Sequence, residues 1–155
     1  MAKVTKSIRV NVPVQTAYNQ WTQFESFPKF MEGVEQVQQL DDKRLRWRAK
    51  VGGKDVAWEA EIMEQIPDQR IAWRNTSGAT NAGVVDFHRV GDAECEISLT
   101  IETEPHGIVE TVGDALGFLD RRVESDVQRF KEYVEGRGTE TGAFRGEIHG
   151  GEVRR

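Results

Sequence analysis

Residues 108–135 read IVETVGDALGFLDRRVESDVQRFKEYVE, and this stretch decides the fold. Its apolar residues recur at steps of three and four, which is the spacing of one stripe along an α-helix. The stripe consists of Val109, Val112, Leu116, Leu119, Val123, Val127, Phe130 and Val134. A helix of this length spans roughly 40 Å at ~1.5 Å per residue, about the width of a small domain. One stripe can therefore pack across everything that precedes it.

Small residues interrupt the first half of this stripe. Gly113 and Gly117 flank Ala115, and Phe118 follows directly. Each glycine costs a helix interior roughly 1 kcal/mol relative to alanine. One interpretation is close backbone packing, or a helix that begins late with Asp114 as its cap. The other is that the small residues leave room for a ligand beside the helix, and both stay open.

Most of the chain before the long helix alternates apolar and polar residues with the period of a β-strand. Strands are predicted over residues 3–12, 33–40, 44–51, 54–66, 69–75, 83–90 and 93–103, and short helices over 14–21 and 24–27. Short hairpin connections predict an antiparallel sheet. Because the alternation is one-sided, we expect the long helix to cover one face. The fold class is therefore α+β, a curved antiparallel sheet around a long C-terminal helix.

Length and composition indicate one globular domain. The chain has 155 residues, of which 37% are hydrophobic and 30% charged, and its net charge is −5. The acidic balance argues against a nucleic-acid partner, which favours a basic stripe. The sequence has neither a signal-peptide core nor the ~20 apolar residues of a membrane span. We therefore expect a cytoplasmic protein with no integral membrane segment, and a homodimer stays open.

The domain is expected to end with the long helix. Gly136 and Gly138 stop the helical pattern. The remaining segment has few apolar side chains, namely Phe144, Ile148 and Val153. We therefore place the domain at residues 1–138 and a mobile tail at residues 139–155, with Phe144 as the candidate for docking.

Four short stretches carry a resemblance to a known family. They are Val12-Pro13-Val14 with Ala17-Tyr18 and Trp21, FESFPKFMEGV at 24–34, WEAEI at 58–62 and PDQRIAW at 67–73. In these residues the chain resembles the polyketide cyclase/dehydrase and lipid-transport family of the START-like superfamily, which includes coenzyme-Q-binding START proteins. The resemblance covers about residues 3–136. It implies the helix-grip (Bet v 1-like) fold with an internal apolar cavity, and it carries over no catalytic motif.

The inward rows of the strands supply the expected cavity lining. The apolar walls are Trp47, Trp58, Trp73, Phe87, Leu99, Leu116 and Phe118, with Gly113 and Gly117 leaving room. Asn75, Arg89 and Thr103 continue apolar rows, and Glu64 follows Ile62 on its row. A polar residue at such a place either emerges into solvent or orients the polar end of a ligand. His106, at the entry to the long helix, lies near a pocket mouth in this fold and could titrate there.

The sequence offers no convergent set of catalytic or metal-binding groups. His88, His106, His149 and the single Cys95 have no partners at zinc spacing, so neither a metal nor another cofactor is expected. Cys95 faces inward, as a small buried hydrophobe does.

Three functions follow from these observations. The first is binding of a hydrophobic small molecule, such as a lipid, a quinone or a polyketide, in the cavity. The second is aromatase/cyclase or dehydratase chemistry on a poly-β-ketone in the same cavity. The third is a protein–protein module in which the aromatic run 24–31 meets a partner.

Overall fold

The computed structural model describes residues 2–31, 34–51, 54–77, 81–103, 115–137 and 141–154. The chain forms β1 (Ala2–Val10), α1 (Val14–Trp21), the 3-10 helix η1 (Phe24–Lys29), β2 (Val34–Gln39), β3 (Arg44–Val51), β4 (Lys54–Ile66), β5 (Arg70–Asn75), β6 (Asn81–Gly91), β7 (Glu94–Thr103), α3 (Ala115–Arg137), β8 (Glu147–His149) and β9 (Glu152–Arg154). Each predicted strand and short helix is present. The long helix is described from residue 115, and residues 108–114 lie outside the described part.

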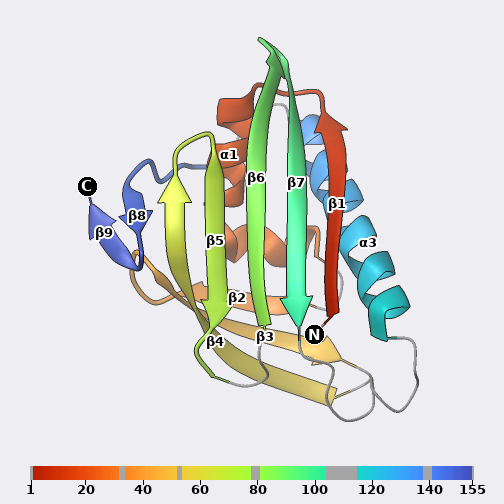
Figure 1. Ribbon diagram of the computed structural model, residues 1–155, viewed down its shortest axis with the longest axis vertical. Helices are drawn as coiled ribbons and strands as arrows, with labels where there is room; N and C mark the ends of the chain where they lie inside the picture. Colours follow the sequence, from red (N-terminus) through yellow and green to blue (C-terminus); the bar gives the residue numbers. More distant parts are fainter. Residues whose placement is uncertain are drawn as a thin grey trace.

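One antiparallel sheet dominates the molecule. Its strand order is β1-β7-β6-β5-β4-β3-β2, and β8 and β9 extend it beside β4. In Figure 1, β5, β6, β7 and β1 stand in front while β3 and β2 cross below them, so the sheet is strongly curved. Helix α1 lies behind the upright strands and α3 runs beside β1. This arrangement confirms the predicted α+β class. We call the face that α1 and α3 cover the concave face, and the opposite one the outer face.

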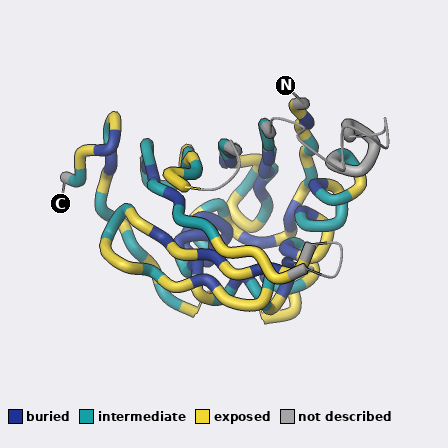
Figure 2. Tube along the Cα trace, turned by 90° about the horizontal axis from the view of Figure 1, so that it is seen from below, coloured by how far each residue is buried: buried dark blue, intermediate teal, exposed yellow. Residues whose placement is uncertain are grey.

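The core lies between the concave face and the helices. Val123, Val127, Phe130 and Val134 of α3 are each at most 2% exposed, which confirms the second half of the predicted stripe. Figure 2 shows buried and exposed residues alternating along the strands, as one-sided burial requires. The side chains of Leu116 and Leu119 lie outside the described residues.

The aromatic run between α1 and β2 belongs to this core. Phe24, Phe27 and Phe30 are at most 3% exposed. Trp21 packs edge-on against Phe27 and Phe130, with ring centroids 5.5 and 4.8 Å apart. These rings join the short helices to α3. The expectation that this run meets a protein partner is therefore wrong, because its rings are already buried within the chain.

Register shifts occur in three strand pairs of the described sheet, namely β2–β3, β4–β5 and β6–β7. The first bulge lies between Val34 and Gln36 of β2. A second bulge, between Ile62 and Glu64, reverses the inside-outside parity of β4. Glu64 therefore points outward, where its carboxylate accepts from the Arg70 guanidinium at 2.9 Å. Gln65 takes the inward place instead and is 1% exposed, which corrects the prediction for Glu64.

Polar contacts fasten α3 to the edge strand β1. The ammonium of Lys6 lies 3.0 Å from a carboxylate oxygen of Asp120, and this hydrogen bond raises the pKa of Lys6. Nearer the other end of the helix, the backbone N–H of Asn11 donates to Glu135 at 2.7 Å. The helix is thereby held on β1 along its length, and its buried stripe is directed at the concave face.

Residues 141–154, which we call the C-terminal strap, are bound to the rest of the domain. The sequence had predicted a mobile tail over residues 139–155. Thr141 and Gln20 exchange two hydrogen bonds, and Arg145 makes a bidentate contact of 2.8 Å with Asp68. Ile148 in β8 is fully buried opposite Gln65 of β4. The strap thus covers α1 and the edge of β4 that β3 leaves open.

The buried thiol of Cys95 and the buried phenol of Tyr18 predict a loss of stability at alkaline pH. Burial raises the pKa of Cys95 from 9.0 to about 11, and that of Tyr18 from 10.0 to about 12. Well below pH 9.0 both groups stay protonated whether the chain is folded or not, so stability is complete. As the pH rises toward 11, the unfolded chain releases protons that the folded chain keeps, and stability falls. Urea denaturation across this range measures the fall, and Cys95→Ala with Tyr18→Phe should flatten it.

Candidate functional site

Apolar side chains on the concave face become more exposed toward one end of the sheet. Along β4 the inward row begins with the buried Ile62 and Ala60, continues with the half-buried Trp58 and ends with Val56, which is 41% exposed. On β7 the buried Leu99 is followed by the half-buried Ile101. In Figure 1 this is the lower end, where β4 and α3 begin. A concave apolar surface that is only half covered is the expected geometry of a ligand site.

Two tryptophans on neighbouring strands stack on this surface. Trp47 of β3 and Trp58 of β4 are register partners, and their rings lie 5.8 Å apart and 7° from parallel. Trp47 is 7% exposed and rests on Phe27 at 5.5 Å, so the core supports it and Trp58 is the outer ring of the stack. The half-buried indole of Trp58 therefore presents a fixed flat surface.

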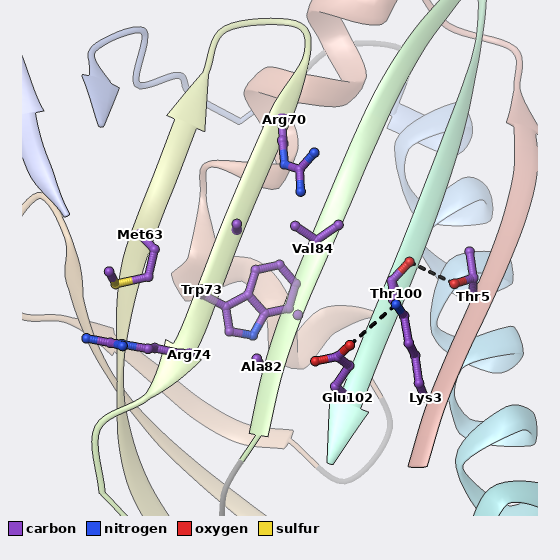
Figure 3. Close-up of a pocket in the computed structure, with 12 residues that line it drawn as sticks. Lys3, Thr5, Met63, Arg70, Trp73, Arg74, Ala82, Val84, Thr100 and Glu102 are labelled. Carbon is purple, nitrogen blue, oxygen red and sulfur yellow. Dashed lines mark hydrogen bonds and ion pairs between the residues drawn. The ribbon is translucent and has the colours of Figure 1, made fainter. Parts of the chain in front are cut away.

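Trp73 extends the aromatic surface to the next strands. It pairs with Ile62 of β4 on one side and with Gly83 of β6 on the other. A Cβ atom at position 83 would lie 2.3 Å from the Trp73 ring, so glycine is needed for the indole to lie over β6. The ring spans the gap between β5 and β6 in Figure 3.

The concave surface carries few polar groups among the described residues. Asn75, at the end of the β5 row, is half-buried and pairs with Ala60. The indole nitrogen of Trp47 and the hydroxyl of Tyr133 are buried and have no hydrogen-bond partner among the described residues. Buried donors are rarely left without an acceptor. Both atoms are therefore polar groups whose partner is not found in the described part of the chain.

The predicted wall residues Phe87 and Leu99 lie in the packed core. Arg89, which was predicted to face the cavity, lies away from the site. Phe87 packs edge-on against Tyr18 at 5.3 Å, and Leu99 is 1% exposed. Arg89 is exposed at the opposite end of β6, where it pairs with Asp92. The bulge between Arg89 and Gly91 ends the inward row there. The placement of Arg89 in the cavity is thus corrected.

For six further predicted site residues, the structure describes either the backbone alone or nothing. Thr103 ends β7 opposite Ala2 and Asn81, and its side chain is not described. The same holds for the side chains of Leu116, Gly117 and Phe118 within α3, and His106 and Gly113 lie outside the described residues. Their roles in the cavity stay predictions.

The structure adds residues to the concave face that sequence reasoning missed. Lys6 lies on the inward row of β1 with Val4 and Ile8, a parity that the sequence carries. Val56 and Ile101 also lie on the inward rows of their strands, next to the predicted wall residues Trp58 and Leu99. Within the described ranges, no three histidine, cysteine, aspartate or glutamate side chains gather as metal ligands. In the same part of the chain, no helix has the length and apolarity to cross a membrane.

Comparison with known proteins places the chain among relatives of one architecture. A START superfamily protein from Mycobacterium smegmatis superposes with a TM-score of 0.74 at 13% identity, covering 88% of this chain and 99% of that one. The Zhui aromatase/cyclase from Streptomyces sp. R1128 gives a TM-score of 0.73 at 15% identity, covering 92% of this chain and 98% of that one. At these identities the likeness establishes the START-like, helix-grip fold.

Sequence comparison establishes the family. An uncharacterized 17.2 kDa protein in the melC2-rnhH intergenic region of Streptomyces lincolnensis is 50% identical over 149 residues, which is 96% of this chain and 99% of that protein. The model of the family described as polyketide cyclase/dehydrase and lipid transport matches residues 10–132. Since that match spans most of the chain, including β2 to β7 and most of α3, the chain belongs to the polyketide cyclase/dehydrase and lipid-transport family.

Proposed function

We propose that the protein binds a hydrophobic small molecule between the concave face and α3. The observation that carries the proposal is the gradient along β4, from the fully buried Ile62 through the half-buried Trp58 to the exposed Val56. Exposed apolar surface on a concave face is stabilised when a ligand covers it, because its burial is worth roughly 25 cal/mol per Å². The family description, which names polyketides and lipids, supports the same class of ligand.

The aromatic groups favour a ligand with a flat, unsaturated part and a polar oxygen. Trp58 offers a half-buried ring stacked on Trp47, and Trp73 offers a second half-buried ring on the neighbouring strand. Offset stacking on such rings is worth ~0.5–1.5 kcal/mol beyond the area buried. The indole N–H of Trp47 would donate to a carbonyl or phenol oxygen of the ligand. An isoprenoid quinone or an aromatic polyketide has both features, and a saturated acyl chain lacks the ring.

Replacing the exposed ring of the stack tests the site. We expect Trp58→Ala to weaken binding of an apolar fluorescent probe about tenfold, because the probe loses its flat contact. Trp73→Ala should act in the same direction. The readout is a titration followed by the emission of the probe, with native mass spectrometry of the purified protein to detect a co-purified ligand.

Leu40→Ala is the matched control for this titration. Leu40 is 37% exposed and lies after β2, away from the concave rows. It removes an exposed apolar side chain without touching the proposed site. Equal probe binding by the wild type, Trp58→Ala and Trp73→Ala would place the probe elsewhere and contradict the proposal.

Cyclase or dehydratase chemistry on a poly-β-ketone is the second candidate, and the family's description as polyketide cyclase/dehydrase favours it. The same cavity would then fold the ketone chain before the reaction. Incubation with a poly-β-ketone thioester separates the candidates. An enzyme changes the distribution of cyclised products, whereas a carrier binds the compound and leaves its spontaneous products unchanged.

A further inference from the structure

The outer face of the sheet carries a second hollow, on the side opposite the proposed ligand site. It measures about 470 Å³ and is lined by residues of β1, β4, β5, β6 and β7, namely Lys3, Thr5, Met63, Arg70, Ala72, Trp73, Arg74, Ala82, Gly83, Val84, Thr100 and Glu102. Trp73 and Gly83 lie on the inward rows of Ile71 and Val85, so they bound the hollow from within the sheet. Figure 3 shows the hollow centred on β5 and β6. Neither α1 nor α3 covers this face in Figure 1.

Small side chains create the hollow, and long ones surround it. Ala72, Ala82 and Val84 form the floor, whereas Met63 and Arg74 stand at its margin. One uncharged row crosses the sheet through Ala72, Val84 and Thr100 to Thr5, whose hydroxyl lies 2.9 Å from that of Thr100. An uncharged floor inside a charged margin is the usual arrangement of a protein contact surface.

The adjoining row of the ladder has an ordered charge pattern. From β4 to β1 its register partners are Glu61, Arg74, Ala82, Glu102 and Lys3. Their charges run negative, positive, neutral, negative, positive. If a second copy of this row is reversed about Ala82 and laid against the first, each charged residue lies opposite a residue of the opposite charge. A surface that complements its own reversed copy is the requirement of a two-fold symmetric interface.

We propose that the outer face pairs with the same face of a second copy of this chain, about a two-fold axis that runs along β6. Arg74 of each copy then faces Glu102 of the other, and Glu61 faces Lys3. Val84 lies on the axis and meets its own counterpart. The long side chains at the margin fold into the two hollows and fill them.

The remaining charges on this face are compatible with the pairing. The axis brings Asp86 of the two copies together, but each is already 3.6 Å from the Arg70 guanidinium of its own chain. Lys3 lies 3.4 Å from Glu102 within one chain, so Glu102 would be held by two cations in the dimer. Arg74 is exposed and has no ion-pair partner among the described residues, so pairing supplies one.

Charge reversal at Arg74 tests the interface in the full-length protein. Sedimentation equilibrium of the wild type should show a monomer–dimer equilibrium, and Arg74→Glu should raise its dissociation constant at least about tenfold, because two like-charged contacts replace two attractive ones. Arg48→Glu is the matched control, since Arg48 is an exposed arginine on the outer face of β3 beyond the hollow. Circular dichroism checks that each variant is folded.

Restoring the complementary charges keeps the test independent of folding. The double variant Arg74→Glu with Glu102→Arg should dimerise as the wild type does, because both contacts are then attractive with their signs exchanged. A mixture of the single variants Arg74→Glu and Glu102→Arg should form a heterodimer more tightly than either variant pairs with itself. In that heterodimer the introduced glutamate faces the introduced arginine, and the other contact keeps the wild-type pair. A wild type that stays monomeric at all concentrations overturns the proposal, as does a dimer that Arg74→Glu leaves intact or that Arg48→Glu weakens equally.

Discussion

Replacing Phe130 by alanine lowers the free energy of unfolding by about 3–5 kcal/mol, the range for removing a buried aromatic ring. Phe130 is fully buried, and its ring lies 4.8 Å from Trp21 and 5.3 Å from Phe30. Through these two rings, Phe130 connects α3 to the last residue of α1 and to the residue that follows η1. The cavity left behind is bounded by rings that are themselves held by other contacts, so it cannot collapse. Urea denaturation followed by circular dichroism measures the loss.

Tyr133→Phe is the control for this variant. Tyr133 lies one turn further along α3, half-buried, with its ring 5.3 Å from Phe30. The change keeps the ring and removes only the hydroxyl, so stability should change by less than about 1 kcal/mol. If Phe130→Ala were as mild as Tyr133→Phe, the aromatic cluster would not be what joins α3 to the short helices.

Removing residues 139–155 lowers the free energy of unfolding by roughly 3–5 kcal/mol. Burial of an aliphatic side chain such as Ile148 contributes ~1.5–3 kcal/mol. Each part-buried hydrogen bond that the strap makes contributes ~0.5–1.5 kcal/mol. Among them are the pair between Gln20 and Thr141 and the bond from the Phe144 N–H to Thr22. A thermal melt of the truncated chain measures the difference.

Point variants separate the parts of the strap. Ile148→Ala should reproduce about half of the loss, because its pocket beside Gln65 opens. Glu152→Ala, an exposed residue of β9, should be neutral. The truncated chain should also associate at high concentration, since the edge of β4 beyond β3 loses its cover. An unchanged melting temperature after truncation would mean that the strap is a mobile tail, as the sequence alone suggests.

Periodicity was sufficient to predict the layers of the fold. Strand alternation and the helical stripe depend on which local pattern can bury one face, and that information is carried by neighbouring residues. Val123, Val127 and Trp47 therefore lie where their spacing predicts. The same reasoning placed Trp58 and Trp73 on the concave face. Parity also carried the signal for Lys6, which stands on the same row as Val4 and Ile8.

Periodicity could not predict which polar side chains at the strand ends face the candidate site. A single extra residue in β4 moved Glu64 outside and Gln65 inside, and nothing in the local alternation of β4 signals this bulge. Arg89 followed an inward row that ends at the β6–β7 hairpin. At strand ends, whether a side chain meets solvent or a cavity depends on which element lies above it.

The sequence by itself determined the α+β class, the order of elements and the apolar rows, because each depends on local periodicity. Only the tertiary structure decided the place of residues 141–154, whose contacts with Gln20, Thr22 and Gln65 join positions more than seventy residues apart. It also decided that Trp47 and Trp58 stack and that Gly83 leaves space for Trp73. Such contacts depend on how separate elements meet in space, and a polar, glycine-rich segment such as the strap gains its partners only when the sheet is already built.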